Sequence, residues 1–202
     1  MDPNGGKSMK NRKQSSQLLW MCMVAIFAAL LVTLNLTGLG MIRLWIIDLT
    51  TYCVVVVAGA LVLGWKGGAI LGAVFGLLSF WTALTAPSAL VAPVVQWSPV
   101  AAFVLSVLPR IGIGLAAAGV YHLLGKTKLN AHAAACIAAV CGSLSNTVFY
   151  LSTMLLMYSV MGQFTTALLT SLALVVVNNG ILEAVLAGII CAPVVAALKK
   201  LK

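Results

Sequence analysis

The sequence predicts an all-α, polytopic membrane protein: a bundle of six transmembrane helices with both termini in the cytoplasm. Hydrophobic residues make up 62% of the 202 residues and charged residues 7%, which is more apolar surface than a soluble domain of this size can bury. Several apolar runs exceed about 18 residues, the length that favours a membrane-spanning helix. The runs are continuous rather than alternating at period two, which argues against a transmembrane barrel.

The chain divides into a basic N-terminal segment (1–16), a single membrane domain (17–198) and a basic tail (199–202). Residues 1–8 are expected to be partly an artificial extension, with the native start at Met9. The apolar run that follows is long enough to span a membrane and ends without a small-residue cleavage site. It therefore indicates a first transmembrane helix rather than a signal peptide.

Six spans are predicted from the apolar runs and the polar segments between them. They cover residues 18–36, 47–64, 68–84, 98–124, 131–158 and 168–198. An even number of spans places both termini on one side of the membrane. A tight turn is expected at 64–68, whereas 37–46 and 85–97 are expected to be longer loops on the opposite side. Pro99 suits the first turn of the fourth span.

The basic residues identify the cytoplasmic side. With these spans, all except Arg43 and Arg110 fall on the side of the termini, which the positive-inside rule makes cytoplasmic. They are Lys7, Lys10, Arg12, Lys13, Lys66, Lys126, Lys128, Lys199, Lys200 and Lys202. The net charge of +9 thus reflects orientation in the membrane rather than binding of nucleic acid.

The tryptophans agree with this topology, because the aromatic belts of a membrane protein lie at its two interfaces. The inner interface is assigned Trp20 and Trp65, and the outer interface Trp45, Trp81 and Trp97.

Small residues recur at four-residue spacing in three of the spans, a pattern typical of close helix packing in membranes. They are Gly68, Gly72 and Gly76 in the third span, Gly180, Ala184 and Gly188 in the sixth, and Ala25 and Ala29 in the first. For Ala25 and Ala29 the pattern alone favours packing within the bundle over docking on a partner protein.

Arg110 is a charged residue inside the fourth span. A cation near mid-membrane costs at least roughly 2.5–3.5 kcal/mol, so it usually faces the protein interior and has a partner. Arg110 lies about 12 residues, or roughly 18 Å, from the start of its helix, and Asn146 and Glu183 are expected at a similar depth. Two interpretations remain open: an ion pair between Arg110 and Glu183, or a pocket in which a ligand carboxylate binds Arg110.

Further hydrogen-bonding groups accompany this cluster. Tyr150, Asn178 and Asn179 are expected slightly closer to the outer side, and Gln96 and Trp97 are expected to reach in from the loop before the fourth span. For Gln96, capping of a local backbone group is the stronger alternative.

Enzymatic motifs are missing from the sequence. The triplet Gly125-Lys-Thr127 is not a phosphate-binding loop, because Gly119 is one residue out of register and no strand precedes it. Hydrolase signatures are absent, and the five cysteines lie in apolar runs without a histidine at metal-ligand spacing. The chain is therefore expected to be neither an enzyme nor a holder of a metal or cofactor.

Four motifs on six short spans resemble the substrate-binding S component of an energy-coupling factor (ECF) transporter over residues 15–198. They are Ala25/Ala29, Pro109-Arg-Ile-Gly-Ile-Gly114, Gly142-Ser-Leu-Ser-Asn-Thr147 and Asn179-Gly-Ile-Leu-Glu183. The resemblance implies a subunit of the bacterial cell membrane that captures a vitamin at its outer face and topples to release it inside. It also implies a scaffold transmembrane subunit (T component), docked at Ala25 and Ala29, and two cytoplasmic ATPases that bind ATP and Mg.

Within that family the chain looks most similar to the riboflavin, folate and pantothenate binders. Arg110 favours an anionic vitamin, and the hydrogen-bonding groups around it suit pantothenate, a small acid with amide and hydroxyl groups. Folate remains an alternative if Trp81 and Trp97 stack on its pterin, whereas riboflavin has no carboxylate for Arg110. A membrane-embedded enzyme or an assembly factor without transport activity is the alternative from another class.

Overall fold

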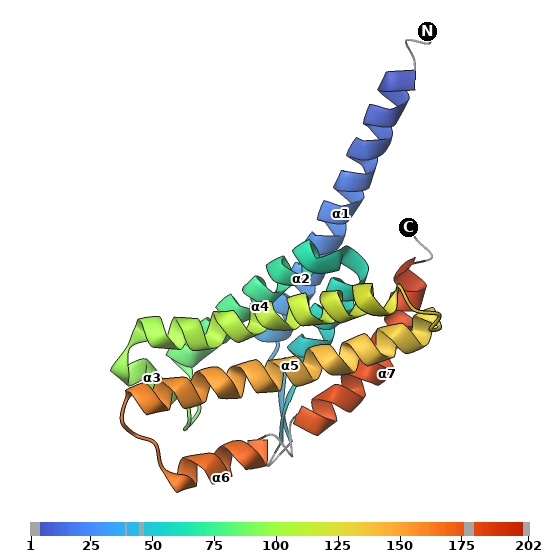
Figure 1. The fold of residues 1–202 in the computed structure, drawn as a ribbon. Coiled ribbons are helices and arrows are strands. Elements are labelled where there is room, and N and C mark those ends of the chain that lie inside the picture. Colours follow the sequence, from blue (N-terminus) through green and yellow to red (C-terminus); the bar gives the residue numbers. More distant parts are fainter. Residues whose placement is uncertain (1–4, 39, 45–46, 176–179, 200–202) are drawn as a thin grey trace.

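The computed structural model describes residues 5–38, 40–44, 47–175 and 180–199. These parts of the chain are mainly helical, with one short β-hairpin (Figure 1). The elements in chain order are α1 (Gly5–Leu36), β1 (Met41–Leu44), β2 (Ile47–Thr50), α2 (Thr51–Thr85), α3 (Ala92–Trp97), α4 (Pro99–Leu124), α5 (Ala131–Val160), α6 (Thr166–Val175) and α7 (Ile181–Lys199).

Four helices are long and apolar enough to cross a membrane, namely α1 from Gln14 onward, α2, α4 and α5. The predicted spans 98–124 and 131–158 agree with α4 and α5 to within two residues at each end. Pro99 begins α4 as predicted, and the Ser98 hydroxyl caps the helix by accepting from the Ala101 amide at 3.4 Å.

Gly64 divides α2 into two arms, a first arm (51–63) and a second arm (65–85). Its φ of 77° and ψ of −171° leave the helical region, and a positive φ favours glycine because it has no Cβ. At this break the Leu63 carbonyl accepts a hydrogen bond from the Trp20 indole of α1 at 3.1 Å. The structure thus confirms a backbone break at the start of the predicted turn, although helix resumes directly after Gly64.

The connection between α1 and α2 is a β-hairpin rather than a loop. Strands β1 and β2 pair antiparallel, with Arg43 opposite Asp48 in the register. Residues 47–50 therefore belong to a strand, and the prediction that a transmembrane helix begins at 47 was wrong by four residues. Ile and Thr in this segment are β-branched residues that fit a strand as well as a helix.

The prediction of one long sixth span over 168–198 is not confirmed. Among the described residues of this stretch, α6 runs to Val175 and α7 begins at Ile181. Residues 176–179, between these two helices, lie outside the described part of the chain.

The predicted glycine stripes lie at helix–helix contacts. A Cβ on Gly68 would lie 2.7 Å from the Gly114 carbonyl oxygen, and one on Gly76 would lie 2.7 Å from the Val107 Cα. The second arm of α2 therefore approaches the backbone of α4 closely along the segment that contains Arg110. In α7, a Cβ on Gly188 would lie 3.2 Å from the Cys136 sulfur of α5, which is a side-chain contact and a looser one.

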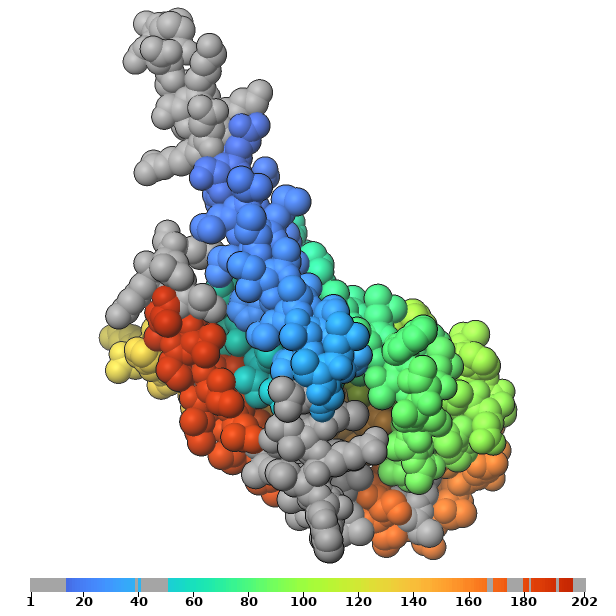
Figure 2. Space-filling view, turned by 180° about the vertical axis from the view of Figure 1, so that it is seen from behind, coloured from blue at the N-terminus to red at the C-terminus, as the bar shows by residue number. Residues whose placement is uncertain are grey.

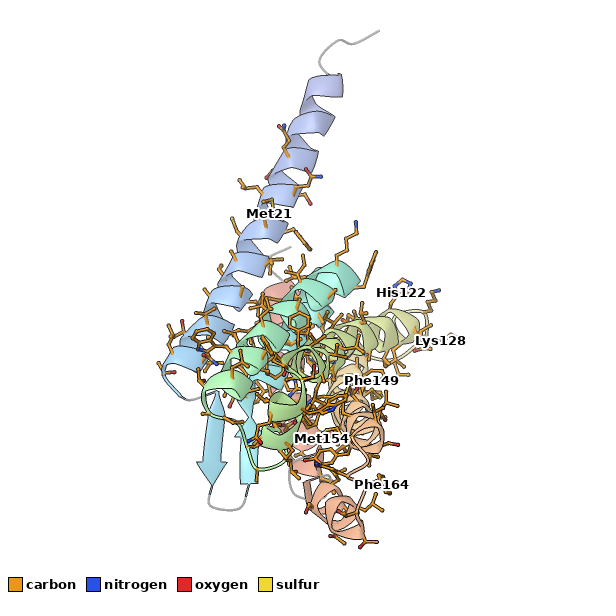
Figure 3. All side chains as sticks on the ribbon, turned by 90° about the vertical axis from the view of Figure 1, so that its left-hand side faces the viewer. Met21, His122, Lys128, Phe149, Met154 and Phe164 are labelled. Atoms are coloured by element: carbon orange, nitrogen blue, oxygen red, sulfur yellow. The ribbon has the colours of Figure 1, made fainter. Side chains whose placement is uncertain are left out.

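The turns of the bundle gather at two ends. The turn at Gly64 and Trp65 and the connection at Gly125 and Lys126 line one cavity of about 550 Å³, so they lie at the same end. The beginning of α1 and the end of α7 point toward this side (Figure 1). Figure 3 shows His122 and Lys128 here and Phe164 toward the opposite end, where the hairpin and α3 lie.

Candidate functional site

Arg110 is held by a carbonyl group of its own helix. Pro109 is buried inside α4 and has no N–H, so the helix cannot form the usual hydrogen bond to the Leu105 carbonyl four residues earlier. The Arg110 Nη1 donates to this carbonyl at 3.3 Å. The adjacent proline and arginine thus form a local unit in which one residue frees an acceptor and the next one uses it.

Two aromatic rings contact the Arg110 guanidinium. Its Cζ lies 4.4 Å from the ring centroid of Tyr150 in α5 and 5.5 Å from that of Phe75 in the second arm of α2. A cation over an aromatic face is attracted by the ring quadrupole, most strongly where water is excluded. These contacts restrain the guanidinium inside the bundle and tie three helices together at this point.

The contacts continue from Phe75 to α1. The ring of Tyr52, in the first arm of α2, stacks on Phe75 with centroids 5.1 Å apart. The Asn35 side-chain amide, at the end of α1, donates to the Tyr52 hydroxyl at 3.1 Å. Arg110 is therefore linked through two aromatic residues to the helix that carries Ala25 and Ala29.

A cavity of about 100 Å³ lies beside Arg110, toward the end of the molecule where the hairpin and α3 lie. Its walls come from α1, both arms of α2, the connection before α3, α4 and α5. The lining residues are Asn35, Tyr52, Ser79, Thr82, Ala83, Ala86, Ser88, Val91, Leu105, Ser106, Arg110 and Tyr150. Hydroxyl and amide groups thus surround a single cation, with small apolar side chains between them.

Two buried polar atoms of the predicted cluster lack a hydrogen-bond partner within the part of the chain that the structure describes. They are Arg110 Nε and Asn146 Oδ1. Leaving a buried donor or acceptor unpaired costs about 1–3 kcal/mol, so such atoms are usually met by water or a ligand. At Arg110 the unpaired donor belongs to a residue that lines the cavity.

The structure gathers part of the predicted cluster around Arg110. Tyr150 contacts it directly, and Glu183 is 5% exposed and lies within electrostatic range of it. Asn146 lies one helical turn before Tyr150 on α5. Asn178 and Asn179 fall outside the described residues.

The aromatic and amide groups expected from the outer loop lie elsewhere. Trp81 is 64% exposed and Trp97 is 49% exposed, and neither lines the cavity. Gln96, on the short helix α3, is exposed as well.

Sequence reasoning missed most of the polar lining. Ser79 and Thr82 follow Phe75 on one face of α2 at spacings of four and three residues, and Ser106 precedes Arg110 by four residues on α4. Polar groups recurring at helical spacing on an otherwise apolar span were the available signal. Asn35 and Tyr52 gave no such signal, because their approach depends on how α1 meets α2.

The face of α1 that carries Ala25 and Ala29 is open. Both residues are exposed, whereas Phe27 and Leu31 turn inward and are buried. Figure 2 shows the described surface of α1, from residue 14, standing out on one face of the molecule. The two alanines therefore do not serve as buried packing residues within the described part of the chain.

Comparison with known proteins identifies the family of this chain. The family described as "ECF transporter, substrate-specific component" matches residues 20–195. The chain is also 31% identical, over 203 aligned residues, to the pantothenic acid transporter PanT of Lactococcus lactis subsp. cremoris (strain MG1363). The alignment covers 95% of this chain and 97% of that protein. This chain is therefore a membrane protein that belongs to the substrate-specific components of ECF transporters.

Proposed function

We propose that this chain captures pantothenate in the cavity beside Arg110, as the substrate-binding subunit of an ATP-driven vitamin uptake transporter. The observation that carries the proposal is a half-buried arginine that lines a cavity and whose buried Nε has no partner among the described residues. A carboxylate matches such a group because it accepts two parallel hydrogen bonds from arginine. The similarity to a pantothenic acid transporter supports pantothenate as the anion.

The rest of the cavity suits the rest of pantothenate. Its amide and hydroxyl groups find partners in Asn35, Ser79, Thr82 and Ser106, which are short polar groups spread over three helices. Folate fits less well, since no tryptophan is among the described lining residues to stack on its pterin. Riboflavin brings no carboxylate to Arg110.

Capture requires the cavity to widen. Its volume is about 100 Å³, whereas pockets that hold small molecules have about 300 Å³ or more. Ala86, Ser88 and Val91 belong to the connection before α3 and form one wall. We infer that this connection moves outward when the vitamin enters and returns to cover it.

The proposed topology has six spans, which are α1, the two arms of α2, α4, α5 and α7. The described part of α6, Thr166–Val175, is not counted among these spans. Both termini, Lys66 and Lys126 lie on the cytoplasmic side of the bacterial cell membrane, and the Arg110 cavity opens outward. The shared position of the Gly64 turn and the Gly125 connection supports this orientation.

Energy comes from partner subunits in this proposal. The exposed Ala25 and Ala29 face of α1 docks on a scaffold T component, and two cytoplasmic ATPases bind ATP with Mg and hydrolyse it. The whole subunit topples to deliver pantothenate inside. Membership of the substrate-specific component family supports these partners.

Binding measurements on the purified chain test the substrate. Isothermal titration with water-soluble vitamins is expected to detect pantothenate in preference to folate and riboflavin. The Arg110→Ala variant is expected to lose more than tenfold in affinity, or over about 1.4 kcal/mol, because the carboxylate loses its charged partner. Unchanged pantothenate affinity in a folded Arg110→Ala protein would remove Arg110 from the site, and tighter binding of another vitamin would replace the proposed substrate.

A further inference from the structure

The buried proline before Arg110 determines which edge of the guanidinium is available. Pro109 removes one helical hydrogen bond, and its ring crowds the Leu105 carbonyl, which a helix would otherwise direct along its axis. The freed carbonyl accepts from Arg110 Nη1 at 3.3 Å, and Leu105 and Arg110 both line the cavity. One end of the guanidinium is thereby fixed to its own helix.

One donor of the guanidinium, Nε, stays unused among the described residues. Arg110 Nε is buried and has no hydrogen-bond partner among the described residues. The Tyr150 ring at 4.4 Å and the Phe75 ring at 5.5 Å limit rotation of the guanidinium plane. With Nη1 occupied, the edge that carries Nε is the one left to meet a carboxylate, in the side-on geometry of a bidentate pair.

We propose that Pro109 is a positioning residue for recognition of the substrate carboxylate. By freeing the Leu105 carbonyl it orients Arg110 before the ligand arrives, so that little conformational freedom is lost on binding. This inference rests on the proposed function, because it assumes that the anion bound at Arg110 is pantothenate. It makes Pro109 a determinant of the preference for an anion over a neutral analogue.

A second proline in the chain provides a matched control. Pro193 also lies inside a helix, α7, where it removes the hydrogen bond to the carbonyl of Ile189. Pro193 is exposed, and neither residue lines the Arg110 cavity. Replacing Pro193 restores a helical hydrogen bond in the same way, without changing the surroundings of a cation.

The experiment compares pantothenate with pantothenol, its neutral analogue in which a hydroxymethyl group replaces the carboxylate. The full chain in detergent is tested as wild type, Pro109→Ala, Pro109→Val and Pro193→Ala. Val returns the N–H while keeping most of the volume of the proline ring, so the two variants at 109 differ in packing but share the restored helical bond. Affinities come from competition against radiolabelled pantothenate, which also scores weak binders.

We expect both variants at Pro109 to lose about tenfold in pantothenate affinity, the magnitude of one charge-assisted hydrogen bond, with pantothenol affinity unchanged. Pro193→Ala should match the wild type with both ligands. Equal weakening of both ligands would show a merely structural role and overturn the inference, as would unchanged discrimination in folded Pro109 variants. Failure of the wild type to bind pantothenate would instead overturn the proposed function.

Discussion

The Arg110 cavity and the outer face of α1 are opposite in character. Around Arg110, side chains from four helical segments are held by named contacts: a carbonyl hydrogen bond, two ring contacts on the cation and a stacked aromatic pair. On α1, 11% of the most apolar window is buried, against 72% in α2, and Ala25 and Ala29 are exposed. One region is preorganised and inward-facing, whereas the other is apolar and exposed.

This difference supports a separation between the proposed capture of substrate and the proposed docking on a partner. A cavity lined by fixed polar groups selects a small polar ligand, and an exposed small-residue face suits close approach of another membrane helix. The two regions are joined by the contacts from Arg110 through Phe75 and Tyr52 to Asn35. Substitutions on either side of this connection should therefore separate binding from uptake.

The largest effect is expected on the α1 face. Replacing Ala25 and Ala29 together by Leu should abolish most uptake in cells while leaving pantothenate affinity unchanged, because bulky side chains prevent close helix approach. Ala173→Leu, at an exposed alanine of α6, provides the control. Radiolabelled uptake and binding by the purified chain are compared. Normal uptake by the double variant would contradict the docking role.

A smaller effect is expected where α2 supports the Arg110 segment. A Cβ on Gly72 would press on the Arg110 carbonyl oxygen, whereas one on Gly119 of α4 would meet open space. Gly72→Ala should lower the free energy of unfolding by about 1–3 kcal/mol through overpacking and weaken pantothenate binding. Gly119→Ala should be neutral or slightly stabilising. Equal thermal stability of the two variants would count against the close α2–α4 contact.

At Tyr150 we expect a loss of about 1 kcal/mol, or roughly fivefold in affinity, on substitution by Ala, because one of the two ring faces that restrain the guanidinium disappears. Tyr150→Phe keeps the ring and serves as the control, with a much smaller change in affinity. Isothermal titration with pantothenate distinguishes them. Similar losses in both variants would assign the role to the hydroxyl group instead of the ring.

The smallest effect is expected at Glu183, which is buried within electrostatic range of Arg110 but does not line the cavity. Glu183→Gln removes a negative charge that repels the carboxylate of the ligand, so affinity should rise by about threefold. Pantothenol, which carries no charge, should bind unchanged. Weaker pantothenate binding would show that Glu183 acts mainly by orienting Arg110.

Periodicity and composition were sufficient for the long uninterrupted helices. The bounds of α4 and α5 and the glycine stripe of α2 follow from hydrophobic runs and residue spacings, which do not depend on the tertiary structure. The pairing of β1 with β2 escaped prediction, because a hydrophobic segment of this length permits both strand and helix.

The cavity was predicted only in its charged centre. Arg110 stands out because a cation in an apolar run is costly unless it has an interaction partner. Tyr150 was included for its position on the next helix. The neighbours that bound the cavity on its other sides, such as Asn35, Tyr52 and Thr82, are unremarkable in the sequence. Trp81 and Trp97 were chosen for their chemistry, yet their exposure depends on how α2 and α3 are turned.

By itself, the sequence determined that this protein is built from apolar helices and where its glycine seams lie. It also determined that Arg110 needs an interaction partner within the bundle. These properties follow from hydrophobicity, spacing and the free energy of a buried charge, which are local to the chain. Only the tertiary structure decided which groups contact Arg110, because the rotation of each helix about its axis selects the side chains that meet. The Leu105 carbonyl and the rings of Tyr150 and Phe75 come together for that reason.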